Sequence, residues 1–69
     1  MEDLKTSNPL AHSQNIRGTL QEVSDHLRKD IDKVEDVRAQ VLFEASAEVI
    51  DGLIKSFSRY EKVSEEAWR

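Results

Sequence analysis

The chain has no cysteine and contains only two glycines and one proline among its 69 residues. Without cysteine it can form neither disulfide bonds nor thiolate metal sites, which are two common means of stabilising very small domains. A domain of this size buries only about 60% of the surface that its unfolded chain exposes, so its core is marginal. Oligomerisation is another common means, so we expect the chain to carry a surface that supports it.

Long hydrophobic runs and blocks of like charge are also missing. No apolar run approaches the roughly 20 residues of a transmembrane helix. Basic and acidic residues are interspersed, with a formal net charge of -4, which argues against a nucleic-acid-binding tail or a basic membrane-surface helix. Met1-Glu2-Asp3 carries acids where a signal peptide needs basic residues. We expect a cytoplasmic protein that has neither nucleic acid nor membrane as a partner.

The motifs of known catalytic chemistry are lacking too. Gly18 and Gly52 are isolated, so there is no glycine-rich loop for phosphate. The serines are scattered, and none lies in a nucleophile elbow. A chain of two helices also offers no concave site that excludes water. We predict that the protein is not an enzyme and needs no cofactor.

Helical periodicity is the strongest signal present. We expect residues 1–7 to form a flexible tail and residues 8–69 a helical hairpin. Asn8 is a favoured N-cap, and Pro9 suits the first helical position. The spacing predicts a first helix over about residues 9–31, because apolar residues recur at intervals of three and four. These residues are Ile16, Leu20, Val23, Leu27, Ile31 and Val34.

The pattern predicts a second helix over about residues 36–67, with a wider apolar arc of roughly 180°. Its centre line consists of Leu42, Ala45, Val49, Leu53, Phe57, Tyr60 and Ala67. One flank of the arc adds Phe43, Ile50, Ile54 and Trp68.

The segment 31–37 decides between a hairpin and one continuous rod. If the chain were a single helix, the second apolar stripe would be offset by roughly 80° from the first, which favours a break. Asp32 with Glu35 has the spacing of a capping box, and Asp36 is an alternative cap. A short connection makes the helices antiparallel neighbours. The predicted fold is all-α: an antiparallel two-helix hairpin that dimerises into a four-helix bundle.

Carboxylates and histidines are the candidates for ligand chemistry. Glu44, Glu48 and Asp51 recur at i, i+4 and i+7, a spacing that could bind a hard cation. They lie opposite the apolar arc, so we expect a solvated face and no metal site. His12 and His26 are fourteen residues apart on one border of the first helix. They leave open an alternative function, a small metal- or ligand-binding bundle that uses these histidines and nearby carboxylates.

A line of small residues borders the arc of the second helix. It consists of Ala45, Gly52 and Ser56, and a mid-helix glycine favours close approach of another helix, either the first helix or one from a partner. We expect a small non-catalytic protein of adaptor or regulatory type, acting through self-association and protein–protein contacts. The expected partner is a second copy, with another helical protein as a further possibility. The predicted interface comprises Leu42, Ala45, Val49, Ile50, Gly52, Leu53, Ile54, Phe57, Tyr60 and Trp68.

Overall fold

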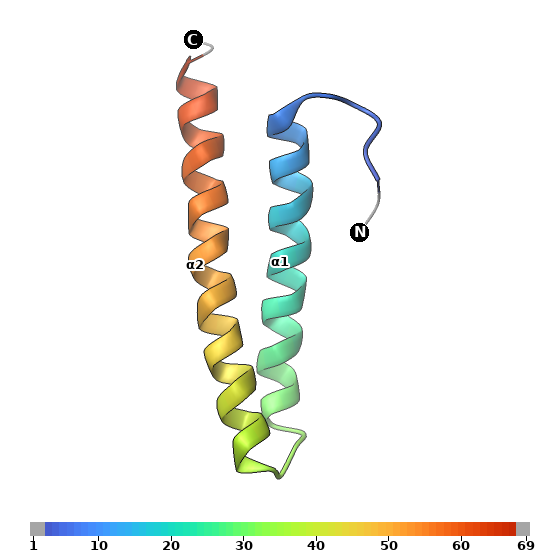
Figure 1. Ribbon diagram of the computed structural model, residues 1–69, viewed down its shortest axis with the longest axis vertical. Helices are drawn as coiled ribbons and strands as arrows, with labels where there is room; N and C mark the ends of the chain where they lie inside the picture. The colour runs from blue at the N-terminus through green and yellow to red at the C-terminus, as the bar shows by residue number, and fades with distance from the viewer. Residues whose placement is uncertain (1–2, 68–69) are drawn as a thin grey trace.

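Two antiparallel α-helices form the molecule (Figure 1). The computed structural model describes residues 3–67, and side chains for residues 3–65. Helix α1 spans Pro9–Ile31 and helix α2 spans Val37–Ala67. Within the described residues, all regular secondary structure is α-helical. The prediction of an all-α helical hairpin is therefore confirmed.

The start of α1 follows from two adjacent residues. The Asn8 side-chain oxygen accepts a hydrogen bond from the backbone N–H of Leu10 at 2.9 Å. This bond satisfies one of the N–H groups that the first turn of a helix leaves free. Pro9 occupies the first turn, where its missing N–H removes no hydrogen bond. Asn8 is therefore the N-cap, as its sequence position indicates.

The connection between the helices consists of residues 32–36. Asp36 is the N-cap of α2, since its side-chain oxygen accepts a hydrogen bond from the backbone N–H of Arg38 at 2.9 Å. Gln40 stabilises the connection by donating its side-chain N–H to the Val34 carbonyl at 2.8 Å. Asp32 instead caps the end of α1. Of the two caps that the sequence allows, Asp36 is the one used, and the single-rod alternative is wrong.

The hairpin is long and flat, with principal extents of 49 × 23 × 13 Å and a radius of gyration of 15.0 Å. A compact domain of this length would have a radius of gyration of about 11 Å. The accessible surface is 5590 Å², whereas a compact monomer of 7.9 kDa exposes roughly 4,400 Å². Two helices in a single layer leave most of each helix uncovered.

The faces through which α1 and α2 contact each other, which we call the seam, bury few apolar residues completely. Among the described residues, Ala47 is the only hydrophobic residue that is buried, at 1% exposed. On α2 the seam follows alternating steps of four and three residues through Phe43, Ala47, Ile50, Ile54, Phe57 and Glu61. On α1 the corresponding steps run through Ser13, Arg17, Leu20, Ser24, Leu27 and Ile31.

The seam of α1 is displaced from the apolar stripe expected for that helix. Ser13 and Ser24 are buried, while Val23, which the stripe includes, is 43% exposed. Leu20, Leu27 and Ile31 belong to both sets and are half-buried. The helix has therefore turned part of its apolar stripe away from α2. Neither helix, over the described residues, is long and apolar enough to cross a membrane.

Candidate interaction surface

Two polar clusters join the helices along the seam. The outer cluster, toward the free ends of the hairpin, joins Ser13 and Arg17 of α1 to Glu61 of α2. The Ser13 hydroxyl donates to Glu61 Oε2 at 3.0 Å, and Arg17 Nε donates to both carboxylate oxygens at 2.9 and 3.1 Å. The Glu61 side chain is only 8% exposed. The Arg17 guanidinium and the Ser13 hydroxyl hold the pKa of Glu61 below its ordinary value, although burial opposes this shift.

The inner cluster, nearer the connection, repeats the arrangement with Ser24, Arg28 and Asp51. The Ser24 hydroxyl donates to Asp51 Oδ1 at 2.8 Å, and Arg28 Nη2 donates to Asp51 Oδ2 at 2.6 Å. Arg28 also donates to the Ser24 hydroxyl oxygen. The hydrogen bonds from Arg28 and Ser24 lower the pKa of Asp51. Each cluster is therefore a serine and an arginine on α1 that hold one carboxylate of α2.

The inner cluster corrects the expectation that Asp51 lies on a solvated face with Glu44 and Glu48. Glu44 and Glu48 are exposed, but Asp51 turns toward α1 because its carboxylate is held by Arg28. A pattern based on hydropathy assigns serines and charged residues to the surface, so it missed both clusters. The sequence did contain a signal for these clusters. The spacing Ser-x-x-x-Arg occurs twice on α1, eleven residues apart, and Asp51 and Glu61 lie ten residues apart on α2. The two spacings nearly match, so each serine–arginine pair can meet one carboxylate.

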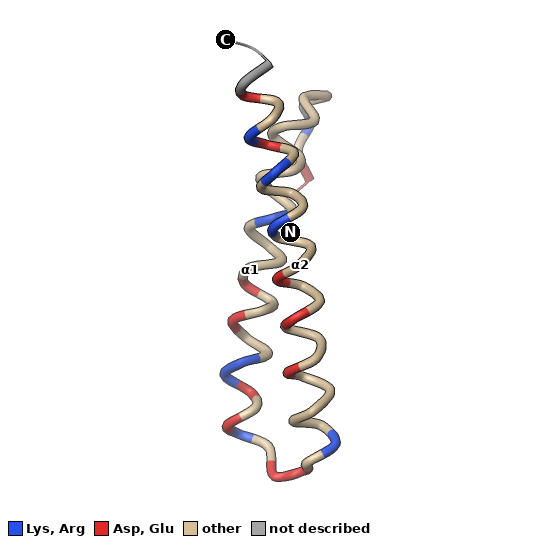
Figure 2. The backbone as a smooth tube through the Cα atoms, turned by 90° about the vertical axis from the view of Figure 1, so that its left-hand side faces the viewer, with Lys and Arg blue, Asp and Glu red and all other residues tan. Residues whose placement is uncertain are grey.

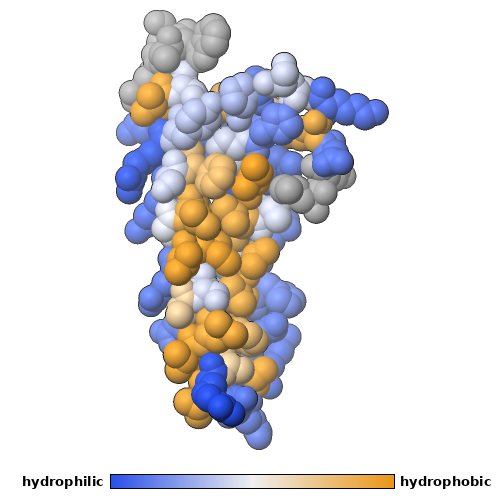
Figure 3. All heavy atoms as spheres, in the orientation of Figure 1, coloured by the Kyte–Doolittle hydropathy of each residue, from blue (hydrophilic) through white to orange (hydrophobic). Residues whose placement is uncertain are grey.

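A continuous apolar surface lies beside the seam, on one side of the hairpin. Figure 3 shows hydrophobic residues gathered along this side over both helices. We define the open face as Val23 of α1 together with Leu42, Val49, Leu53 and Tyr60 of α2, which are between 43% and 66% exposed. The four α2 residues fall on one line, because each step of 7 or 4 residues returns to nearly the same angle at about 3.6 residues per turn. Such a surface on a small protein typically marks an interaction site.

The residues of the predicted interface fall into three groups. Leu42, Val49, Leu53 and Tyr60 lie on the open face, and Ala45 and Gly52 are exposed beside it. Ile50, Ile54 and Phe57 are half-buried and belong to the seam with α1. Trp68 lies outside the described residues. The structure thus brings six of these residues together on one uncovered side of α2.

The close approach expected at Gly52 is not made by α1. A Cβ atom added to Gly52 would meet no neighbouring atom within 4 Å. Ser56, one turn later, turns its hydroxyl to the Gly52 carbonyl oxygen at 3.2 Å and so keeps its polar group on its own helix. If another helix approaches the small residues of α2, it must come from outside this chain.

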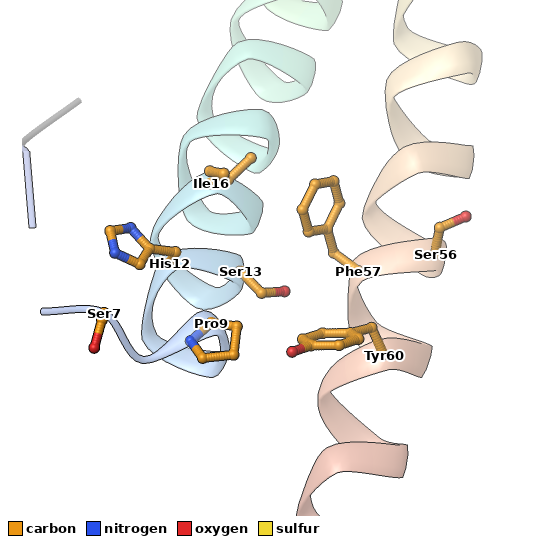
Figure 4. A pocket seen from close by; sticks show the side chains of 8 residues that line it. All are labelled: Ser7, Pro9, His12, Ser13, Ile16, Ser56, Phe57 and Tyr60. Carbon is orange, nitrogen blue, oxygen red and sulfur yellow. The ribbon is translucent and has the colours of Figure 1, made fainter.

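An open pocket of about 550 Å³ lies near the free end of the hairpin, between the start of α1 and the second half of α2 (Figure 4). Phe57 and Tyr60 project from α2 toward Ile16 and Pro9 of α1. The pocket is further lined by Ser7, His12, Ser13 and Ser56. Tyr60 and Phe57 connect it with the open face and the seam, so it forms a hollow at one end of the apolar surface.

The two histidines do not converge. His12 Nε2 donates to the Thr6 carbonyl oxygen at 2.6 Å and holds the segment before α1 against the helix. His26 Nε2 lies 3.2 Å from Asp30 Oδ2 on the same helix, exposed to solvent. Among the residues that the structure describes, no three His, Asp or Glu side chains lie close enough to hold a metal ion.

The chain matches no family model, no curated protein and no solved structure.

Proposed function

We propose that this protein is a non-catalytic helical interaction module that associates with itself through the open face, giving a four-helix bundle. The observation that carries the proposal is the near absence of a core. Ala47 is the sole buried hydrophobic residue of the described part, whereas four large apolar residues of α2 line up in solvent. Covering a large aliphatic side chain contributes about 1.5–3 kcal/mol, so covering the open face would add substantially to the stability of the hairpin.

The surface area supports the same proposal. The chain exposes roughly 1,200 Å² more than a compact monomer of its mass would expose. A standard stable interface buries about 800 Å² on each partner. A second copy that covered the open face would therefore bring the exposed surface per chain close to that of an ordinary small domain.

The rotation of the helices also supports a bundle. In a four-helix bundle each helix directs its apolar stripe toward the common core of all four helices and not straight at its nearest neighbour. Val23 of α1 and Leu53 of α2 are turned in this way, because both are exposed and each lies roughly 80° around its helix from the centre of the seam. Figure 3 shows hydrophobic residues gathered on one side over both helices. A hairpin that functioned alone would gain by turning these residues into the seam.

The proposal is tested by light scattering over a range of protein concentrations, with the variants Val49→Asp and Ser58→Asp. We expect a mass of twice 7.9 kDa for the unaltered chain. Val49→Asp should yield monomers, because it would put an uncompensated charge in each half of the contact. Ser58→Asp adds the same charge at an exposed position of α2 off the open face and should remain dimeric. A well-folded monomer at micromolar concentration for the unaltered chain would contradict the proposal.

A second candidate function is binding of a small apolar ligand in the pocket at the free end. Tyr60 and Phe57 supply aromatic surface, and His12 supplies one polar group at the rim. The open character of the pocket favours the first proposal, because ligand sites usually enclose most of their ligand. Titration with a solvatochromic apolar dye distinguishes the two functions. If the dimer binds the dye, and Tyr60→Ala abolishes this binding without changing the mass of the dimer, the ligand site is favoured.

A further inference from the structure

The pocket at the free end of the hairpin opens on the same side as the open face, because Ile16 and Tyr60 both lie on that side of their helices. Its walls are Pro9 and Ile16 of α1 and Phe57 and Tyr60 of α2, as Figure 4 shows. The pocket volume is about 550 Å³, and the surface inside it is mostly apolar. Filling such a hollow with an apolar side chain is favourable, so the pocket suits a projecting residue of a partner.

Along α2 the open side has the same order of side chains in both directions. Large apolar residues and serines occur in mirrored order about position 51. The mirrored pairs are Val49 with Leu53, Ser46 with Ser56, and Leu42 with Tyr60. A surface with this order is complementary to itself when a second copy is turned end to end. In that arrangement Leu42 of one copy comes to Tyr60 of the other, where the pocket lies.

The exposed apolar residue of α1 lies at the same height along the hairpin as this centre. Ser13 bonds to Glu61 and Ser24 to Asp51, so the numbers of residues at the same height add up to 74 or 75. Position 51 of α2 is therefore level with Val23 and Ser24 of α1. Val23 is 43% exposed, and it is the one exposed large hydrophobic residue of α1 in the described part. The two helices thus centre their open side on one line across the hairpin.

We propose that Leu42 of a second copy fills the free-end pocket, and that the two open faces meet end to end with the two-fold axis crossing the hairpin at Val23. This inference rests on the self-association proposed above and adds its geometry. Each helix packs on the same helix of the second copy, so two layers of two helices close a bundle. Val23 faces its own copy, and Leu42 packs against Tyr60 at both ends. Asp30 of the second copy comes to the polar rim of the pocket, near His12.

Stacking the open faces with both connections at the same end would cover them less well. Helix α1 of the second copy would then lie on α2, and it ends at Ile31, level with position 43 or 44. Leu42 would remain uncovered beyond that end. Val49 would lie against the polar His26, whereas the end-to-end pair sets Val49 against Leu53. The order of side chains therefore favours the end-to-end pair.

Cysteine cross-linking tests the axis directly, because the chain contains no cysteine of its own. In a glutathione redox buffer, Val23→Cys should form a disulfide-linked dimer by itself, since each Val23 faces its own copy across the axis. The same-end arrangement predicts instead a mixed disulfide between Val23→Cys and Leu53→Cys when the two variants are combined. Mass spectrometry distinguishes these products. A prevailing mixed disulfide would overturn the end-to-end pair and leave self-association intact, whereas a monomer in light scattering would overturn both.

Shortening Leu42 tests the filling of the pocket. Leu42→Ala should raise the dissociation constant of the dimer roughly a hundredfold, which is about tenfold for each of the two pockets. Val41→Ala is the matched control, because Val41 is also exposed on α2 but lies off the open face. It should change the constant by less than about twofold. An unchanged constant for Leu42→Ala would overturn the filling and leave the pocket free for a small ligand.

A double-mutant cycle tests the contact between Leu42 and Tyr60. Within one chain these residues are eighteen positions apart, about 27 Å along the helix, so they meet only across the dimer. If they do meet, Leu42→Ala combined with Tyr60→Ala should weaken association by clearly less than the product of the two single effects. A double variant that shows the full product would contradict the proposed contact.

Discussion

The two faces of α2 are built from different side chains. The face toward α1 combines the small Ala47 with the carboxylates Asp51 and Glu61, whereas the open face carries Leu53 and Tyr60. The covered face thus adds hydrogen-bonded carboxylates to half-buried apolar side chains, whereas the uncovered face relies on apolar side chains alone. In a self-sufficient domain the apolar side chains of the open face would be covered. The charged residues of α2 lie outside this apolar side, and Figure 2 shows their places along the helix. The difference teaches that the hairpin contact and the proposed association contact have separate chemical bases, so substitutions should affect them separately.

The largest expected effect comes from enlarging one alanine on each face. Ala47→Phe should destabilise the hairpin by about 3 kcal/mol, since the seam has no space for an aromatic ring. Ala45→Phe, on the uncovered side, should leave the fold of the monomer intact and weaken association. Thermal unfolding at several protein concentrations separates the two effects, because only association makes the midpoint depend on concentration. If both variants behaved alike, the separation of the two faces would be wrong.

A fair part of this architecture could be predicted from the sequence. The all-α hairpin, the cap at Asn8 and the break after Ile31 follow from periodicity and from residues with strong local preferences. Such features are fixed by nearby atoms, so a linear pattern retains them. The breadth of the apolar arc of α2 also indicated that α1 alone could not cover it.

The orientation of each helix about its own axis could not be predicted in the same way. It depends on Arg17 and Arg28 reaching carboxylates that are 44 and 23 residues away in the sequence. The apolar stripe placed Val23 toward α2, but the clusters set Ser13 and Ser24 there instead. A hydropathy pattern gives only the mean direction of the whole apolar arc. A few charge-assisted hydrogen bonds decide which part of that arc faces the neighbouring helix.

Acid should loosen the seam by a smaller amount and leave the open face chemically unchanged. The pKa values of Asp51 and Glu61 are lowered in the folded chain, so these carboxylates contribute stability at neutral pH. That contribution is lost as the pH falls through their lowered pKa values, below the ordinary range of a carboxyl group. Thermal unfolding followed between pH 7 and pH 3 should show this loss, and Glu61→Gln should show a flatter profile. An equally steep profile for Glu61→Gln would mean that other carboxylates account for the loss of stability in acid.

The smallest change in stability is expected when each of the two glycines is replaced by alanine. These two substitutions also compare most directly a position off the open face with one beside it. Each would accept a Cβ atom without meeting a neighbour in the chain. Gly18→Ala should therefore stabilise the protein by about 0.5–1 kcal/mol, the usual gain of alanine over glycine within a helix. Gly52→Ala should give a smaller gain, or a loss of stability, if a second copy packs beside Gly52. Equal stabilisation by both substitutions, measured by chemical denaturation, would show that no helix approaches Gly52.

The two polar clusters also suggest an order of events in folding. Ser24 and Asp51 are 27 residues apart in the sequence, whereas Ser13 and Glu61 are 48 apart. Bringing the ends of the longer segment together from the unfolded chain costs about 0.5 kcal/mol more in loop-closure entropy. Once the inner cluster has formed, however, the outer one needs only the helices to extend side by side. We expect the chain to close from the connection outward and to open first at its free ends, where Arg17 releases Glu61 while Arg28 still holds Asp51.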